Sequence, residues 1–239
     1  MVKNTNNRIA VLKINVAAAI FCALAYASEY LLHIKVMFLT FDIKDSIIAI
    51  AAMIFGPVYA LMMGVVVATI ELFTMSDTGL YGFVMNVLST VAFTVIASLI
   101  YRYKKTIYGA VLGMISGALA MTAVMILANM IITPYYMGVT RGEVIALIPK
   151  LFLPFNLLKA TFNASIAMML YKHIVTALRR ARIISARDSK SGFDGEAKTE
   201  AVGGRSLSRS IIVTLGALAV AALSIVILIF GLGANIEWF

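Results

Sequence analysis

The chain has 239 residues, of which 62% are hydrophobic and 13% are charged, and its mean hydropathy is +0.98. A soluble domain carries about 25% charged residues, so one soluble core of this size could not bury so much apolar surface. The formal net charge of +9 does not indicate nucleic-acid binding, because phospholipid headgroups suit basic residues that flank membrane helices. The composition predicts an all-α, polytopic membrane protein.

A spanning helix needs about 20 apolar residues. The qualifying stretches are Val11–Leu32, Ile47–Phe55 leading into Pro57–Phe73, Phe83–Ile100, Ile107–Thr133, Leu151–Ile174 and Ile211–Phe230. The second stretch is too long for one helix, and the residue before a proline disfavours helical geometry. We therefore expect two shorter helices joined by a tight turn at Gly56–Pro57. The prediction is a compact six-helix module over residues 1–182 and a seventh transmembrane helix within residues 210–239.

The segments between the apolar stretches differ in character. Residues 183–209 are rich in Ser, Gly and charged residues, a composition typical of a flexible linker, which we place in the cytoplasm. Lys35–Asp45 alternates apolar and polar residues, which predicts an extended segment that packs over the module. Thr133–Val144 carries Pro134, two tyrosines and two glycines, which predicts a turn-rich cap rather than a helix.

The distribution of Lys and Arg predicts the orientation. Most of the 20 basic residues fall in residues 1–13, in Tyr101–Tyr108 and in the segment after the sixth span. The positive-inside rule places all three in the cytoplasm, together with the N-terminus, and the protein in the cell membrane. The single cysteine, Cys22, lies in the first span, so no disulfide framework or thiolate metal site is expected.

Polar side chains at membrane depth are costly and are candidates for function. Asn156, Lys159 and Asn163 fall on one face of the sixth span, at spacings of three and four residues. Further polar residues share their depth in the outer half of the membrane and come from other spans: Glu29, Asp45, Glu71, Asn86 and Asn129. This clustering predicts a polar pocket that opens to the outside. The candidate ligand-binding residues are Asn129, Asn156 and Lys159, with Asp45 as a weaker fourth.

Structural roles are the alternative for these residues. A lone Asn in a membrane helix is commonly an interhelical hydrogen-bond partner. Glu29 and Glu71 lie near the ends of their spans and could sit at the level of the headgroups. Lys159 could form a structural ion pair with Glu71.

Small residues form a stripe on the first span. Ala19, Ala23 and Ala27 recur every four residues, and such a stripe lets another helix approach closely. We interpret it as an interface with a partner protein. Packing within the bundle is the alternative.

Motifs of enzymes and of metal or nucleotide sites are absent from the sequence. We therefore predict that the chain is not an enzyme and holds no metal. Any uphill transport would depend on a partner or on ion coupling.

Several motifs resemble those of a known family. A six-helix module of about 170 residues with an alanine stripe and no ATPase is similar to the substrate-binding S subunits of energy-coupling factor (ECF) vitamin importers. Three segments resemble those of riboflavin-specific (RibU-type) members: Phe41-Asp42-Ile43-Lys44-Asp45, Asn129 to Tyr136, and Ile148 to Lys159. The last of these, IPKLFLPFNLLK, is the most specific. The resemblance covers about residues 8–178 and leaves residues 183–239 without a counterpart.

The resemblance implies a function and partners. Riboflavin would be captured from outside as a transported ligand, not as a cofactor. A transmembrane coupling subunit with two ATPase subunits would drive its uptake and would pack against Ala19, Ala23 and Ala27. An S subunit for another vitamin or a purine-like compound, and a structural membrane subunit without transport activity, are the alternatives.

Overall fold

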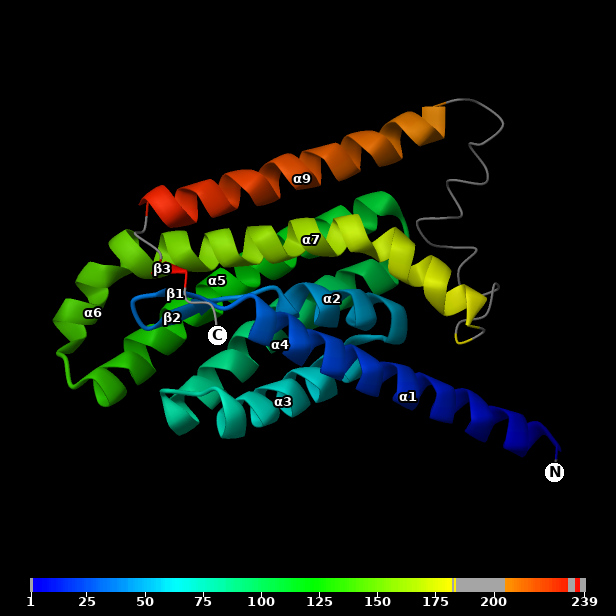
Figure 1. The fold of residues 1–239 in the computed structure, drawn as a ribbon, viewed down its shortest axis with the longest axis horizontal. Helices are drawn as coiled ribbons and strands as arrows, with labels where there is room; N and C mark the ends of the chain where they lie inside the picture. Colours follow the sequence, from blue (N-terminus) through cyan, green and yellow to red (C-terminus); the bar gives the residue numbers. More distant parts are fainter. Residues whose placement is uncertain (1, 182, 184–204, 232–234, 237–239) are drawn as a thin grey trace.

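The computed structural model describes residues 2–181, 183, 205–231 and 235–236 (Figure 1). Its helices are α1 (Val2–Leu31), α2 (Lys44–Phe55), α3 (Pro57–Thr74), α4 (Gly79–Tyr103), α5 (Ile107–Met137), α6 (Arg141–Leu147), α7 (Leu153–Arg180) and α9 (Arg205–Gly231). A π-helical turn, η1 (Ile148–Phe152), joins α6 to α7. Three short strands complete the fold: β1 (Ile34–Val36), β2 (Leu39–Phe41) and β3 (Asn235–Ile236).

The long helices run side by side, and this confirms the predicted all-α, polytopic membrane fold (Figure 1). Six segments of the described residues are long and apolar enough to cross a membrane: Arg8–Leu31, α3, α4, α5, Arg141–Tyr171 and Thr214–Gly231. Helix α2 also belongs to the six-helix bundle predicted from the sequence, but it is shorter than the other five helices. It has 12 residues and is about 18 Å long. Its residues from Ile48 to Ala52 are completely buried, so α2 is surrounded by protein rather than lipid.

The turn between α2 and α3 is the one predicted from the sequence. Gly56 connects the helices with φ 106°, a conformation that favours glycine. Pro57 occupies the first turn of α3, where its missing N–H removes no helical hydrogen bond. Two short helices with a tight turn at Gly56–Pro57 are therefore confirmed.

The segment after α1 forms a β hairpin, as its alternating pattern predicts. Strands β1 and β2 pair antiparallel with Ile34 opposite Phe41 and Val36 opposite Leu39, and Met37 adopts φ 56° in the turn. The apolar residues of both strands point inward, whereas Lys35 and Thr40 are half-buried. Strand β3 pairs with the other edge of β1, so the end of the chain extends the hairpin to three strands.

The prediction of a turn-rich cap over Thr133–Val144 is wrong. Helix α5 continues through Pro134 to Met137 and ends at Gly138, whose φ is 66°. Pro134 lies inside this helix and donates no backbone hydrogen bond there. Helix α6 then begins with a capping box, in which Thr140 and Glu143 satisfy each other's backbone N–H groups. This Thr-x-x-Glu signature is visible in the sequence and outweighs the turn-forming residues around it.

The predicted linker lies mostly outside the described residues, which omit 184–204. Helix α9 begins at Arg205 and packs along α7 (Figure 1). Ala221 and Leu228 of α9 are buried in an apolar cluster that also contains the hairpin residues Ile34 and Phe41. The C-terminal helix is therefore joined to the side of the bundle that carries the hairpin.

Glycines bring α4 and α5 into close contact. A methyl group added at Gly113 would lie 2.7 Å from the carbonyl oxygen of Ala97, and one at Gly117 would lie 2.6 Å from that of Phe93. Gly109, Gly113 and Gly117 thus form a second stripe of small residues at four-residue spacing, and this stripe is buried. It is the close helix approach that small residues permit inside membrane bundles.

We expect Gly117→Ala to lower the free energy of unfolding by about 1–3 kcal/mol, because the new methyl group would push α4 and α5 apart. Unfolding of the detergent-solubilised protein by heat or denaturant measures this loss. Gly216→Ala is the matched control, because a methyl group there meets no atom within 4 Å. Equal stability of the two variants would contradict the packing role of Gly117.

Candidate ligand-binding site

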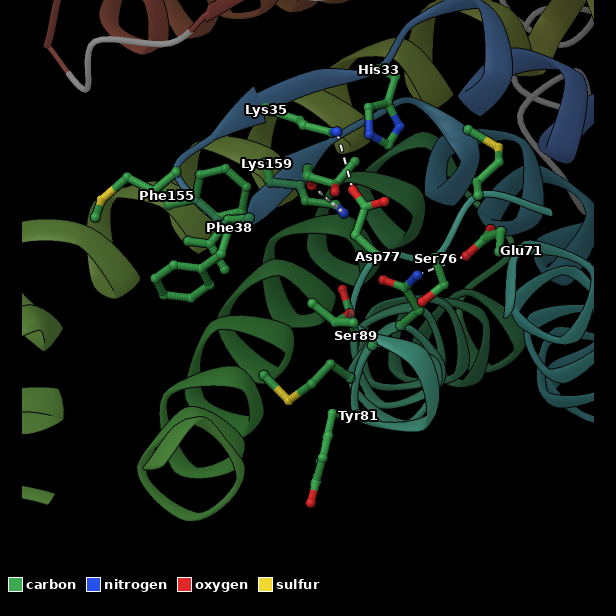
Figure 2. Close-up of a pocket in the computed structure, with 18 of the residues that line it drawn as sticks. His33, Lys35, Phe38, Glu71, Ser76, Asp77, Tyr81, Ser89, Phe155 and Lys159 are labelled. Atoms are coloured by element: carbon green, nitrogen blue, oxygen red, sulfur yellow. Dashed lines mark hydrogen bonds and ion pairs between the residues drawn. The ribbon is translucent and has the colours of Figure 1, made fainter. Parts of the chain in front are cut away.

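A cavity of ≈ 360 Å³ lies beneath the β hairpin (Figure 2). It is lined by the end of α1, the hairpin, the end of α3, the segment joining α3 to α4, the first half of α4, and residues of α5 and α7. Pockets for small organic ligands measure about 300–1,000 Å³ and combine apolar walls with a few convergent polar groups. The cavity has this size and this lining.

Aromatic rings form part of the wall. Phe38, Tyr81, Tyr136 and Phe155 all line the cavity. The ring centroids of Phe38 and Tyr136 are 5.9 Å apart, and those of Tyr81 and Tyr136 are 6.0 Å apart. The hairpin, α4, α5 and α7 each supply one ring, so a flat aromatic ligand could stack between elements that are far apart in sequence.

Lys159 and Asn156 bring polar groups from α7 to the same wall. The Lys159 ammonium donates hydrogen bonds to Asp42 Oδ2 at 2.7 Å and to the carbonyl oxygen of Thr40 at 3.0 Å. Asn156 Nδ2 donates to the carbonyl oxygen of Phe152 at 2.8 Å. Lys159 therefore ties the hairpin to α7 and retains a third ammonium donor for a ligand.

Asp42 remains ionised beside Lys159. Burial alone would raise the pKa of the Asp42 carboxyl, but the ammonium groups of Lys159 and Lys44 outweigh burial and hold that pKa below its usual value. Asp42 Oδ1 also accepts the backbone N–H of Lys44 at 3.2 Å. The hairpin is thus held to the first turn of α2 and to α7 by one carboxylate.

A second charged group lies at the other end of the cavity. Lys44 is 2% exposed and donates to both carboxylate oxygens of Glu29, each at 3.1 Å, and to Glu71 Oε2 at 2.7 Å. Asn86 Nδ2 also donates to Glu71 Oε2, at 2.7 Å. These contacts connect α1, α2, α3 and α4 around one ammonium group.

Asn163 and Asp45 support the site from below. Asn163 Oδ1 accepts from the backbone N–H and the hydroxyl of Ser46, and its Nδ2 donates to the carbonyl oxygen of Asp42 at 2.8 Å. Asp45 Oδ1 accepts the hydroxyl of Thr90 at 2.6 Å. Asn163 and Asp45 are fully buried and do not belong to the lining of the cavity.

Of the four ligand-binding residues selected from the sequence, two line the cavity and two do not. Lys159 and Asn156 line the cavity, whereas Asn129 and Asp45 do not. Asn129 is fully buried and bonds within its own helix, to Met125 and Thr133. The suggested ion pair between Lys159 and Glu71 is wrong, because Lys159 pairs with Asp42, and Glu71 pairs with Lys44.

Lys44 and Asp42 are two buried charged residues that sequence reasoning did not select. Both precede the apolar run of α2, where charged residues usually mark the edge of the membrane. In the structure both are buried, Lys44 against α1 and α3 and Asp42 against α7. The signal that could have found them is the local excess of charge: Asp42, Lys44 and Asp45 stand within four positions.

The amino-acid sequence matches the sequence model of a known protein family. The sequence model of the family described as "ECF transporter, substrate-specific component" matches residues 13–171, more than half of the chain. The chain belongs to this family. Its members are substrate-binding components of importers and work with an ECF module of a transmembrane subunit and ATPases.

Solved structures share the fold. The S component of a bacterial ECF transporter, from a study of its structure and mechanism, superimposes with a TM-score of 0.58 at 21% sequence identity, covering 72% of this chain and 98% of that chain. At this identity the likeness shows the fold alone. No curated protein sequence matches the chain significantly.

Proposed function

We propose that this ECF substrate-specific component binds riboflavin and delivers it for ATP-driven uptake. The observation that carries the proposal is the cavity beneath the hairpin, which is lined by aromatic rings together with Asn156 and Lys159. The isoalloxazine ring is flat and apolar except for a uracil-like edge that needs hydrogen-bond partners. Asn156 and Lys159 also belong to the sequence run that resembles riboflavin-specific members.

The hairpin covers this cavity. Phe38, Leu39 and Thr40 contribute to its lining, and Thr40 is bonded through its carbonyl to Lys159. Entry and release of a ligand would therefore require the hairpin to move. In the orientation with a cytoplasmic N-terminus, which follows from the positive-inside rule, the hairpin lies at the outer end of α1.

A coupling module of one transmembrane subunit and two ATPase subunits would bind to α1. Ala19, Ala23 and Ala27 are exposed on the surface of the isolated protein, whereas Ala17, Ala18 and Ala25 are buried in the bundle. The alanine stripe thus takes no part in the packing of this chain. A membrane surface of small residues is suited to close approach by a helix of another subunit.

We expect the purified protein to bind riboflavin and to quench its fluorescence, because stacking on aromatic side chains quenches the excited flavin. Fluorescence titration and calorimetry at micromolar concentrations measure the binding. The absorption spectrum of the detergent-purified protein would show the two flavin bands if the vitamin is retained. Absence of both quenching and heat would refute the riboflavin assignment.

The same titration, repeated with other ligands, distinguishes the alternative functions. Binding of another vitamin or of a purine-like compound, without binding of riboflavin, would keep the transport role and change the ligand. A protein that binds none of these compounds would fit a structural subunit whose buried polar residues only join helices.

A further inference from the structure

Two buried polar atoms of residues that line the cavity lack a hydrogen-bond partner among the described residues. Glu71 and Ser89 are 3% and 4% exposed, and both line the cavity. Glu71 Oε2 accepts from Lys44 and Asn86, but Glu71 Oε1 has no hydrogen-bond partner, and neither has Ser89 Oγ. A buried polar group without a partner costs about 1–3 kcal/mol. These two atoms are therefore positioned to bind a group that enters the cavity.

The charges around the site favour a ligand that donates hydrogen bonds. Four carboxylates are buried among the described residues and face two buried ammonium groups; they are Glu29, Asp42, Asp45 and Glu71 against Lys44 and Lys159. Burial lowers the pKa of the His33 imidazole, so His33 adds no charge at neutral pH. In surroundings of low dielectric constant, the carboxylate of Glu71 has a strong effect on another charge that comes close to it.

The two ends of the cavity differ in chemistry. In Figure 2, Phe38 and Phe155 lie beside Lys159, whereas Glu71 and Ser76 lie on the opposite side. The aromatic, cationic end suits the ring of a flavin and its carbonyl oxygens. The acidic end offers acceptors, and the hydroxyl groups of a polyol are donors.

We propose that Glu71 and Ser89 form a specificity subsite that accepts hydroxyl groups of a neutral polyol and disfavours its phosphate ester. This proposal rests on the proposed function where it names a flavin as the ligand. The polyol is then the ribityl chain, and the disfavoured ligand is flavin mononucleotide. Glu71 Oε1 accepts a ligand hydroxyl, and Ser89 Oγ donates to or accepts from a second one. A phosphate at the end of the chain would bring negative charge toward the carboxylate of Glu71 and would be repelled.

Three flavins test the subsite: riboflavin, lumiflavin, which has a methyl group in place of the ribityl chain, and flavin mononucleotide. In the unmodified protein we expect the tightest binding for riboflavin. We expect Glu71→Gln to weaken riboflavin binding about tenfold, because Lys44 and Asn86 would occupy the single amide oxygen and the ligand would lose its charged acceptor. Lumiflavin binding should not change, and the preference for riboflavin over flavin mononucleotide should fall by more than tenfold.

Glu143→Gln is the control for loss of a carboxylate outside the cavity. Glu143 is an exposed residue of the capping box of α6, and glutamine can take the same place in a capping box. This variant should leave the binding of riboflavin, lumiflavin and flavin mononucleotide unchanged. Ser89→Ala provides a second test that leaves the charges intact, and it should weaken riboflavin binding but not lumiflavin binding.

The outcomes separate this subsite from the assignment of the ligand. An unmodified protein that binds no flavin refutes the riboflavin assignment. A protein that binds riboflavin, lumiflavin and flavin mononucleotide equally refutes the subsite and leaves that assignment standing. Equal losses for riboflavin and lumiflavin in both Glu71→Gln and Ser89→Ala would also overturn the subsite, because they would indicate damage to the fold.

Discussion

Replacing Lys159 with methionine is expected to lower the free energy of unfolding by about 3–5 kcal/mol and to weaken riboflavin binding tenfold or more. The loss of stability arises because Asp42 is fully buried and would lose its 2.7 Å ion pair with Lys159. A buried charge left without its partner has a cost of this size. The loss of affinity arises because a charge-assisted hydrogen bond to the ligand contributes about 1.5–3 kcal/mol.

A double variant separates the two effects. Adding Asp42→Asn to Lys159→Met removes both charges, and the oxygen of the new amide would still accept the backbone N–H that Asp42 Oδ1 binds. Because replacing a whole buried ion pair is often nearly neutral, we expect most of the stability to return. Riboflavin affinity should stay low. Recovery of both properties in the double variant would assign Lys159 a purely structural role.

The partner of Lys159 could not have been found from spacing. Asp42 and Lys159 are 117 positions apart, and the depth of a residue in its span does not say which neighbour it meets. Glu71 was the plausible partner at similar depth, but the hairpin places Asp42 against α7, and α2 brings Lys44 to Glu71. Helices, turns and the extended segment follow from local patterns, whereas ion pairs depend on how the hairpin folds over the bundle.

Two stripes of small residues also show that residue spacing does not predict which helix a side chain will contact. Ala19, Ala23 and Ala27 on α1 and Gly109, Gly113 and Gly117 on α5 have the same four-residue spacing. The glycine stripe is buried against α4, and the alanine stripe is exposed. Spacing indicates that a helix can be approached closely. Whether the approaching helix belongs to the same chain is decided by the packing of all the other helices.

Replacing Ala23 with leucine is expected to abolish co-purification with the coupling subunit and ATP-dependent uptake, while riboflavin binding by the isolated protein remains intact. Ala23 is exposed on α1, and the cavity involves α1 only at its end, at Glu29. A leucine would therefore disturb neither the bundle nor the site. At an interface with a second helix it would block close approach, and overpacking such a contact costs about 1–3 kcal/mol per site.

Ala25→Leu is the matched control on the same helix. Ala25 is completely buried in the main apolar cluster, so its replacement should destabilise the isolated protein and lower riboflavin binding. The two variants differ by two positions and should show opposite patterns, because one side chain faces outward and the other faces the bundle. If Ala23→Leu unfolds the isolated protein, or if its complex with the coupling subunit forms normally, the alanine stripe is not the surface that docks. Loss of the complex with full riboflavin binding would place the contact on the face of α1 that this chain leaves uncovered.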